Sequence, residues 1–596
     1  MALYLFDKRV RIERLITALG LIVVIGYLLL KSPDTSQKSI VAKEVDSSEL
    51  IGGRIDDLER ERNFLQKMNY RTGKCPDYVE YSQIRHPPLS NGQYQYPFMR
   101  PAPKCRTFVS ESVEYVIRDL KSKVLNDDLA RLIENCLPNT LDTTILWHVP
   151  SEHTKSKLNI LPQTFVVTGD IHAEWLRDSA RQLSVYQPFT KYDSKLREMI
   201  KGAINTQITY ILNSPYCNAF HPPPGSNIKK GNTAMDNVFP RPDWNQVFEC
   251  KYELDSLASF LTLSNEYYAN SGDLSFVTPQ WLKAFDRVLT IMKRESQPSF
   301  DPRSGRASNF YYSFQRQTNI GSETLPLGGV GNPVNSGTGL VRSAFRPSDD
   351  ACILQFFIPA NVHMLTELKN LRKNFLNDKT TFKTQLPDLA LYIKVTDNFI
   401  DSITKGIEKY GIVDHPEFGK VYAYEVDGYG SNLFMDDANI PSLLSMPDMG
   451  FLPVNDDIYQ NTRKMVLSRK GNPYFLEGKV FQGIGGPHIG IENAWPMSLL
   501  MAIRTTDDDS EIKKNLKMIM ETTAGLGLMH ESVHVNAKSG MSFTRSWFAW
   551  CNSEFGKTIL HLAKHKPHLI FKEQYQQPYN LEAVLQNFQL KDKSKN

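Results

Sequence analysis

The chain has 596 residues, of which 41% are hydrophobic and 11% aromatic, so it can bury one large core or two ordinary ones. Its 69 lysine and arginine residues nearly balance its 65 aspartate and glutamate residues, which leaves a formal net charge of +4. We therefore expect no nucleic-acid partner, because such proteins usually concentrate basic charge on one face. The composition excludes a disordered chain and is typical of a globular enzyme, but it indicates no oligomeric state.

A targeting signal occupies the N-terminus. Lys8, Arg9, Arg11 and Arg14 precede an apolar run over residues 15–30. The run is near the lower limit of about 17–25 residues for a membrane-spanning helix, and no small-x-small cleavage signal follows it. Basic flanks stay in the cytosol, so we expect an uncleaved signal anchor; a cleaved signal peptide is the alternative.

These features predict a single-pass type II membrane protein of the secretory pathway, in the Golgi or another endomembrane, with its folded part in the lumen. The expected segments are a cytosolic tail (1–14), a transmembrane helix (15–30), a polar stem (31–65), a folded domain (66–575) and a C-terminal tail (576–596).

Seven cysteines fit an oxidising compartment if some are paired, and their odd number leaves at least one free. No C-x-x-C spacing occurs, so a structural zinc site built on cysteine is not expected. The sequence also contains no Asn-x-Ser/Thr glycosylation acceptor, which is unusual for a long lumenal chain.

A helical rhythm begins after Ser110, where Val113, Val116, Ile117 and Leu120 form one apolar stripe. The same rhythm predicts further helices over residues 254–268, 278–292, 351–372, 388–410, 457–469, 511–523 and 548–565. We expect the first two of these to form a helical hairpin. Repeated helix pairs joined by polar loops predict a mainly α fold, an (α/α)6 barrel with short β-hairpins in its loops and the N-terminal transmembrane helix in addition. A two-domain helical arrangement is the alternative.

Four loop segments concentrate acidic, aromatic and basic side chains, namely 168–179, 345–351, 424–439, and 530–534 together with 544–547. In the first, Trp175 offers a flat apolar face beside the polar groups of Arg177 and Asp178, a combination that suits the apolar faces and hydroxyl rims of sugars. An ordinary ion pair between Arg177 and Asp178 is the alternative.

The second segment contains the doublet Asp349-Asp350 after Arg346 and Ser348. Because a helix is predicted to begin here, these aspartates could simply cap its N-terminus. Their association with Arg346 and the other polar loops favours a role in a site instead.

The fourth segment contains His530-Glu531-Ser532-Val533-His534, a literal match to the zinc-peptidase motif H-E-x-x-H. That motif binds zinc only when it is helical. Preceding glycines and the valines at 533 and 535 predict an extended or loop conformation, which favours Glu531 as a carboxylate base over the metal site.

Several long motifs, in this order, resemble glycoside hydrolase family 125: residues 168–171, 175–179, 346–351, 435–444 and 543–550. The resemblance covers the chain from about residue 70 to about residue 570 and implies an (α/α)6 barrel. It also implies an exo-acting α-mannosidase that acts chiefly on α-1,6 linkages, is metal-independent and inverts the anomeric carbon.

Carried over by motif, the resemblance implies that the general acid is Asp349 or Asp350 and that the base is Glu531. We expect no metal and no cofactor, and an α-mannoside glycan as substrate. The residues expected to bind it are Asp170, His172, Trp175, Arg177, Asp178, Arg346, Asp436, Asp437, His488, His534, Arg545 and Trp547. The alternatives are a zinc metallopeptidase, a non-catalytic mannan-binding protein and a hydrolase of another sugar.

An inverting hydrolase needs a protonated carboxyl beside the leaving oxygen and an ionised one across the ring, separated by roughly 6.5–9.5 Å so that water fits between them. A like-charged neighbour would help the acid to keep its proton, and we expect the Asp349/Asp350 doublet to supply that neighbour.

Overall fold

A computed structural model describes residues 75–151, 161–234, 236–376, 389–537 and 542–593. The chain divides into two compact units, 1–40 and 41–596, and all described residues belong to the second. The predicted cytosolic tail, signal anchor and stem lie outside the described residues. Among the helices that are described, none is long and apolar enough to span a bilayer.

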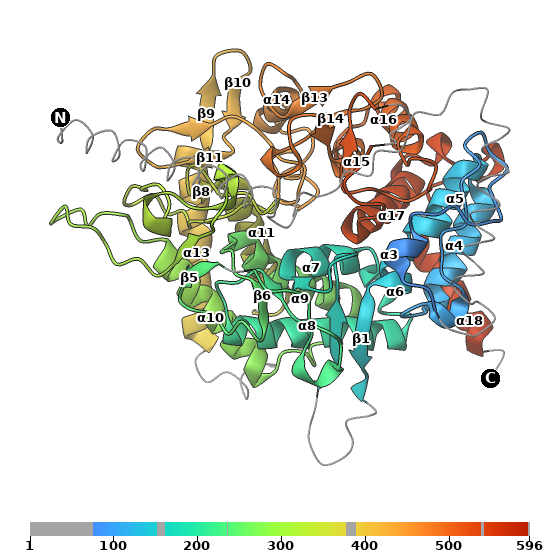
Figure 1. Ribbon diagram of the computed structural model, residues 1–596, viewed down its shortest axis with the longest axis horizontal. Coiled ribbons are helices and arrows are strands. Elements are labelled where there is room, and N and C mark those ends of the chain that lie inside the picture. Colours follow the sequence, from blue (N-terminus) through green and yellow to red (C-terminus); the bar gives the residue numbers. More distant parts are fainter. Residues whose placement is uncertain (1–74, 152–160, 235, 377–388, 538–541, 594–596) are drawn as a thin grey trace, which may run out of the picture. The chain divides into compact units, whose positions relative to one another are not determined.

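The described part is mainly helical, as predicted (Figure 1). Its main helices are α4 (Glu111–Lys123), α5 (Asp127–Cys136), α7 (Leu176–Ser184), α8 (Ser194–Asn213), α9 (Leu254–Ser271), α10 (Pro279–Glu295), α11 (Ile358–Asn374), α13 (Leu389–Gly406), α14 (Asp457–Val466), α15 (Pro496–Arg504), α16 (Asp509–Glu521), α17 (Ala549–His565) and α18 (Leu581–Lys593). Two shorter helices are α3 (Tyr78–Tyr81) and α6 (Asn139–Thr143).

Short strands form small sheets between the helices, as the predicted β-hairpins require. Two-stranded antiparallel pairs are β1 (Ile145–Val149) with β2 (Gln163–Val166), β5 (Asn237–Phe239) with β7 (Ser313–Gln315), β9 (Ile412–His415) with β10 (Gly419–Tyr422), β13 (Phe475–Glu477) with β14 (Gln482–Ile484), and β15 (Asn493–Ala494) with β16 (Val533–His534). Three-stranded sheets have the orders β3 (Glu174–Trp175), β4 (Ala219–Phe220), β6 (Val247–Glu249) and β12 (Asn432–Leu433), β11 (Glu425–Val426), β8 (Phe356–Phe357).

The predicted hairpin of α9 and α10 is confirmed, and its ends follow from local sequence. Gly272 ends α9 in the left-handed conformation (φ 70°), which glycine adopts without steric cost. The Thr278 side chain caps α10 by accepting from the Trp281 N–H. The Trp281 Nε1–H in turn donates to Ser264 Oγ of α9 at 3.1 Å, which fixes the two helices together.

A ring of helices surrounds the centre of the unit: α7 packs on α9 and on α17, α9 on α11, and α17 on α15. Outside this ring, α8 covers α9, α13 covers α11, α16 covers α15 and α5 covers α17. At the position in the ring between α11 and α15, turns around Asp448 take the place of a helix. Asp448 belongs to the ring because it forms ion pairs with Arg504 of α15 at 2.9 Å and Arg181 of α7 at 3.1 Å.

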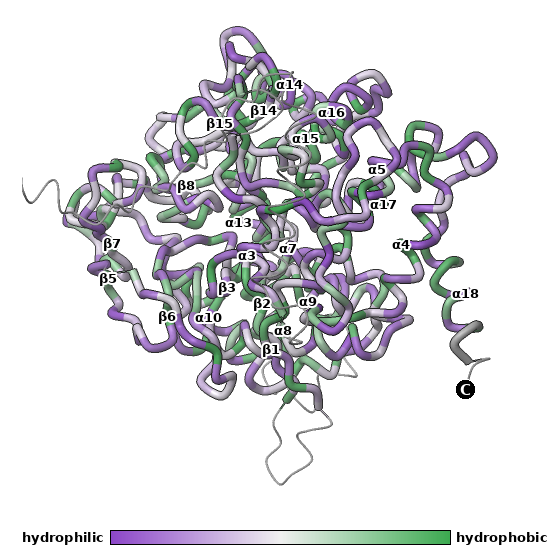
Figure 2. The backbone as a smooth tube through the Cα atoms, turned by 45° about the vertical axis from the view of Figure 1, so that its right-hand side comes forward, coloured by the Kyte–Doolittle hydropathy of each residue, from purple (hydrophilic) through white to green (hydrophobic). Residues whose placement is uncertain are grey.

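Two ring helices, α7 and α15, were not predicted. Every residue of both is buried, including Arg177, Asp178 and Arg181, and each helix has only nine residues, too few for a sustained periodic pattern. Most other helices alternate hydrophilic and hydrophobic stretches along the backbone (Figure 2). The predicted loop over 168–179 is therefore wrong from Leu176 onward, where α7 begins.

The helix predicted over 351–372 begins later, at Ile358. Asp349 has a left-handed backbone (φ 69°), which is incompatible with a helix, and β8 intervenes before α11. The N-cap of α11 is Phe357, so the interpretation of Asp349 and Asp350 as helix caps is wrong.

A buried charge network lies at the centre of the ring. Arg504, whose side chain is 2% exposed, pairs with Glu554 at 2.6 Å and with Asp448 at 2.9 Å. Removing one partner of such a network leaves an uncompensated buried charge. We expect Arg504→Met to lower the free energy of unfolding by about 3–5 kcal/mol, measured by urea denaturation. Arg469→Met, which removes an exposed pair with Glu477, is the control and should leave stability within about 0.5 kcal/mol of the wild type.

The region expected to be a C-terminal tail contains α18, which packs on α4. Leu585 of α18 is 1% exposed. Just before α18, the Tyr579 hydroxyl donates to Asp119 of α4 at 2.8 Å.

All seven cysteines lie in the described region. Disulfides join Cys75 to Cys105 and Cys217 to Cys250, and the other three are free and buried. The expectation of at least one free cysteine is confirmed.

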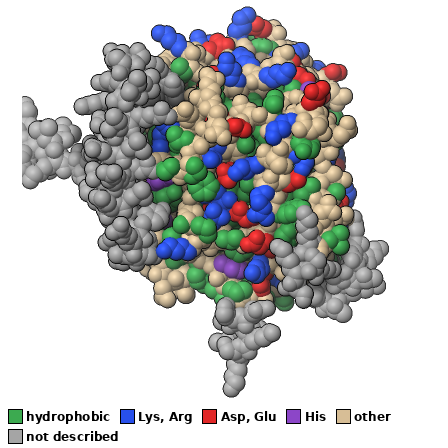
Figure 3. Space-filling model, turned by 90° about the vertical axis from the view of Figure 1, so that its right-hand side faces the viewer, with side chains coloured by type: hydrophobic (Ala, Val, Ile, Leu, Met, Phe, Trp, Pro, Cys, Tyr) green, Lys and Arg blue, Asp and Glu red, His purple; other side chains and the backbone are tan. Residues whose placement is uncertain are grey.

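On the face drawn in Figure 3, lysine and arginine side chains are interspersed with aspartate and glutamate. The near balance of charge in the sequence therefore also holds locally on this described surface.

Candidate active site

A pocket opens where the four predicted loop segments meet, with about 470 Å³ of empty space when the part open to solvent is included. Seven of the predicted site residues line it: Trp175, Arg177, Asp178, Asp349, His488, Glu531 and Arg545. The other lining residues were not among the predicted site residues, although all but Trp495 lie in the motifs that resemble the family: Thr168, Ile171, Pro347, Ser348, Asn439, Trp495, Phe548 and Trp550.

Glu531 is a buried carboxylate with one cation and one hydroxyl bound to it. Its Oε1 pairs with Arg545 Nε at 3.1 Å, and its Oε2 accepts from Thr544 Oγ1 at 2.6 Å. Burial acts to raise its pKa, but Arg545, His488 and these hydrogen bonds outweigh burial and lower the pKa below the ordinary glutamate value. Glu531 is therefore ionised at neutral pH, as a base must be.

Asp349 faces the same pocket from the loop before α11. Its side chain is 20% exposed, and its Oδ1 accepts from Asn218 Nδ2 at 3.3 Å and lies 3.8 Å from Arg177 Nη2. Burial acts to raise the pKa of Asp349, but Lys251 and Arg177 outweigh it and lower the pKa. A single carboxyl group beside Lys251 and Arg177 is ionised at neutral pH.

Asp350 lies behind the pocket wall and is 1% exposed. Its Oδ2 accepts from the His488 N–H and from Ser348 Oγ, each at 3.1 Å, and burial raises its pKa. The expectation that the doublet provides a like-charged neighbour for the acid is wrong, because Asp349 and Asp350 bond to different partners.

The carboxyls that face Asp349 come instead from α7 and from the start of α9. Asp178, Glu253 and Asp255 all surround the Arg177 guanidinium, which pairs with Asp178 at 3.0 Å and with Glu253 at 2.8 Å. Arg177 is thus the centre of an acidic cluster as well as a wall of the pocket. Burial raises the pKa of Asp178 to about 6 and that of Asp255 to about 7.

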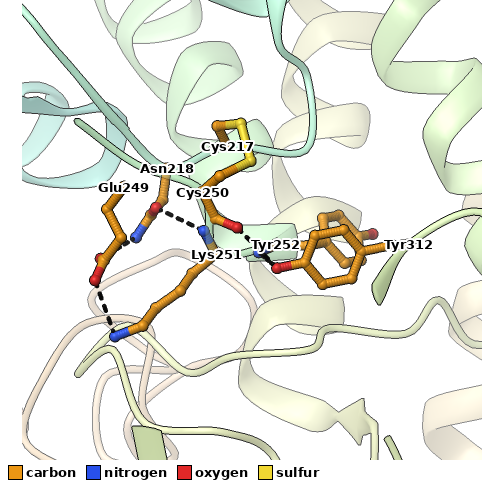
Figure 4. Close-up of a disulfide and its surroundings, with 7 residues drawn as sticks. All are labelled: Cys217, Asn218, Glu249, Cys250, Lys251, Tyr252 and Tyr312. Atoms are coloured by element: carbon orange, nitrogen blue, oxygen red, sulfur yellow. Dashed lines mark hydrogen bonds and ion pairs between the residues drawn. A yellow bond between two sulfur atoms is a disulfide. The ribbon is translucent and has the colours of Figure 1, made fainter. Parts of the chain in front are cut away.

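A disulfide fixes the segments on either side of this cluster (Figure 4). Cys217 and Cys250 immediately precede Asn218 and Lys251, and the Asn218 amide oxygen accepts from the Lys251 N–H at 3.0 Å. The Lys251 ammonium pairs with Glu249 at 3.3 Å. Neither Asn218 nor Glu253 was predicted as a site residue, because a single asparagine and a glutamate before a helix carry no distinctive sequence pattern.

Aromatic side chains form much of the wall. Trp175, Trp495 and Trp550 line the pocket, and Trp550 lies 5.5 Å from the Arg177 guanidinium. The indole N–H groups of Trp175 and Trp495 are buried and have no hydrogen-bond partner among the described residues. Flat apolar faces with unused donors suit the ring and hydroxyl oxygens of a sugar.

Three predicted site residues lie at or near the pocket rim. The Asp170 carboxylate pairs with Arg545, which places it beside a lining residue. His172 is exposed in the turn before β3. Trp547 packs edge-on against Tyr78 at 5.0 Å and is 2% exposed.

Three further predicted residues, Arg346, Asp436 and Asp437, hold loops behind the pocket wall. Arg346, 2% exposed, pairs with Glu425 at 2.6 Å. Asp436 accepts two backbone N–H groups at 2.8 and 3.0 Å, and Asp437 accepts from Asn439, a lining residue. These side chains shape the site through the backbone that they hold.

The H-E-x-x-H segment is not helical: β16 contains His534, which confirms the predicted extended conformation. The ring of His530 is buried, stacks on Phe543 at 4.1 Å, and its Nδ1 bonds to the Ser546 carbonyl at 2.8 Å. His534 instead pairs with Glu492 at 3.3 Å. No group of three or more potential ligands arranged for a metal ion occurs within the described residues.

Comparison with known proteins agrees with this geometry. The family described as metal-independent alpha-mannosidase (GH125) matches residues 126–560. The meiotically up-regulated gene 157 protein of Schizosaccharomyces pombe is 52% identical over 510 residues, 85% of this chain and 96% of that protein. A solved Streptococcus pneumoniae structure from a family of metal-independent alpha mannosidases, in a non-productive complex with alpha-1,6-mannobiose, is 32% identical with a TM-score of 0.66, covering 76% of this chain and 98% of that one. The chain therefore belongs to glycoside hydrolase family 125 and is an α-mannosidase.

Proposed function

We propose that this α-mannosidase removes terminal α-1,6-linked mannose from glycans with inversion, using Glu531 as base and Asp349 as acid. The observation that carries the proposal is that these two carboxyl groups line one pocket with aromatic walls. We also infer that the ring of helices and its outer layer form an (α/α)6 barrel, with the segment around Asp448 in place of one inner helix.

The roles of the two carboxyls follow from their surroundings. Glu531 is ionised and bound by Arg545 and Thr544, so it can take a proton from water. The water attacks the anomeric carbon while Asp349 gives a proton to the leaving oxygen. Asp349 suits the acid role better than Asp350, because Asp350 is buried behind the wall and bonded to His488.

The linkage rests on one further observation: the solved bacterial relative was captured with alpha-1,6-mannobiose, in a non-productive complex. The exo mode is what the resemblance to the family implies.

A test of the reaction uses the full chain with α-1,2-, α-1,3- and α-1,6-mannobiose, with and without a chelator. We expect the α-1,6 dimer to be cleaved fastest, with no effect of the chelator. Proton NMR of the first product should show β-mannose, since the substrate is α-linked. α-Mannose as the first product would overturn inversion, and loss of activity with chelator would favour the zinc alternative.

The pH dependence tests Glu531 as the base. Because Arg545 lowers the pKa of Glu531, the base stays ionised in mildly acidic solution. Arg545→Met raises that pKa, so less base is ionised at low pH and the acidic limb of kcat/KM should move to higher pH by about 1–3 units. Thr544→Val, which removes only a neutral hydrogen bond, should move the limb less; an unchanged limb in Arg545→Met would contradict the assignment.

The sequence alone also left open a non-catalytic mannan-binding protein, which the family match does not favour. Such a protein would keep the aromatic walls but would need no ionised carboxylate opposite an acid. Turnover of any mannobiose by the unmutated chain, lost in Glu531→Gln, excludes it.

For localisation, we propose a type II membrane protein of the secretory pathway, anchored by residues 15–30, on the basis of the basic flank and apolar run. The two disulfides support an oxidising compartment. Alkaline carbonate extraction and protease protection of microsomes test it: the domain should remain in the pellet and resist protease until detergent is added.

A further inference from the structure

We propose that Glu253 is a positioning residue for the acid: it forms with Asp349 a carboxyl pair that shares one proton and delivers that proton to Asp349 during each turnover. This inference rests on the proposed function, with Asp349 as the acid.

The geometry brings the two carboxyls into one hydrogen-bonded unit. Asn218 Nδ2 lies 3.0 Å from Glu253 Oε1 and 3.3 Å from Asp349 Oδ1, so one amide group bridges them. The Arg177 guanidinium also lies 2.8 Å from Glu253 and 3.8 Å from Asp349. Two carboxylates held beside the same amide and the same guanidinium repel each other when both are ionised, so one proton on the pair is favoured.

The charges around Glu253 require the same conclusion. The titratable groups that face it are Arg177, Asp178, Glu249, Lys251, Asp255, Tyr312 and Asp349. Arg316 adds one more cation through Glu249 but also pairs with Asp236 at 2.7 Å, and His488 faces Asp349. Six carboxyl groups, Glu253 and Asp236 included, thus meet three permanent cations, and an unpaired buried carboxylate is costly.

Burial decides which member of the pair keeps the proton. Glu253 is 1% exposed, and burial raises its pKa well above the ordinary glutamate value. Asp349 borders the pocket, where Lys251 and Arg177 lower its pKa. In the free enzyme the proton of the pair therefore resides on Glu253.

The disulfide keeps this pair in place (Figure 4). Cys217 precedes the bridging Asn218, and the Cys250 carbonyl accepts from the Tyr312 hydroxyl at 2.9 Å. The Tyr252 N–H donates to the same hydroxyl at 3.0 Å, one residue before Glu253. Both segments that support the pair are thus tied to buried structure.

The proton balance of one turnover is as follows. As the glycosidic bond breaks, the shared proton passes from Glu253 to Asp349 and from Asp349 to the leaving oxygen, which leaves both carboxyls ionised. The Glu253 carboxylate is then stabilised by Arg177, 2.8 Å away. Glu531 releases to solvent the proton that it took from the attacking water. After the products leave, solvent returns one proton to the pair of Glu253 and Asp349.

The test compares Glu253→Gln with Glu367→Gln. Glu367 is a buried carboxyl of α11 outside the pocket, bonded to Asn265 at 2.7 Å, with a pKa raised by burial to about 7, so it is a matched control. Each variant is assayed across pH on α-1,6-mannobiose, whose alcohol leaving group needs a proton, and on 2,4-dinitrophenyl α-mannoside, whose phenolate does not.

In Glu253→Gln the amide cannot give up a proton to the Asp349 carboxylate. We expect the alkaline limb of kcat on mannobiose to move at least about one unit to lower pH and the rate at pH 7 to fall at least about tenfold. The rate on the dinitrophenyl mannoside should fall less than about threefold, and Glu367→Gln should keep the wild-type profile on both substrates.

Equal losses on both substrates, or an unmoved alkaline limb, would overturn the proton-sharing role. The unmutated chain gives a second measurement that needs no variant. If Asp349 acted alone, mannobiose hydrolysis would already decline as pH rises past about 4, the ordinary aspartate range; the shared proton predicts activity up to neutral pH or above. If the unmutated chain cleaves neither substrate, the proposed function fails and this inference fails with it.

Discussion

Replacing Glu531 with glutamine is expected to lower kcat on α-1,6-mannobiose by about 10²–10⁴-fold, the usual contribution of a general base. The variant keeps the shape of the side chain and the hydrogen bond from Thr544, so the pocket should remain intact. It loses the negative charge that takes a proton from water. The rate is measured by mannose release under initial-rate conditions, and the affinity for mannobiose by calorimetry.

A matched control is Glu492→Gln, on the neighbouring strand region, where the carboxylate is 64% exposed and pairs with His534 at 3.3 Å. It should keep the wild-type rate, because exposed pairs contribute little. Wild-type activity in Glu531→Gln would exclude Glu531 as the base. Loss of mannobiose binding together with activity would indicate a collapsed pocket instead.

Long helices with one buried and one exposed face were the most predictable. α4 shows this in its buried residues Val113, Val116, Ile117 and Leu120 and its capping Ser110. The sequence analysis missed α5, α8 and α18, and it also missed α7 and α15, which have nine residues each and are buried on all sides. The ring of helices depends on contacts between distant segments, which periodicity cannot show.

The site was only partly predictable for the same reason. Glu531 and Asp349 lie in loops dense with acidic, basic and aromatic residues, and that local density is visible in the sequence. Glu253 and Asn218 lie outside these loops, and only the fold brings them to Asp349. A cue was available in Glu249-Cys250-Lys251-Tyr252-Glu253-Leu254-Asp255, where three acidic residues surround a cysteine at the start of a predicted helix.

Substituting Asp349 and Asp350 one at a time separates a chemical role from a structural one. Asp349→Asn is expected to lower kcat on α-1,6-mannobiose by about 10²–10⁴-fold, because the amide cannot protonate the leaving oxygen. On 2,4-dinitrophenyl α-mannoside the loss should be far smaller, since that leaving group departs as an anion. The ratio of the two rates, measured for the wild type and the variant at one pH, reports the acid directly.

Asp350→Asn provides the comparison at the adjacent residue. One oxygen of its carboxyl, Oδ2, accepts from both the His488 N–H and Ser348 Oγ; an uncharged asparagine oxygen can accept the same two bonds but holds them more weakly. We expect both substrates to lose rate by the same factor, with a lower melting temperature as His488 and the loop shift. If instead Asp350→Asn lost only mannobiose activity while Asp349→Asn lost both equally, Asp350 would be the acid, and Glu253 would have no proton to share with it. The two adjacent variants thus decide which carboxyl acts on the glycosidic oxygen.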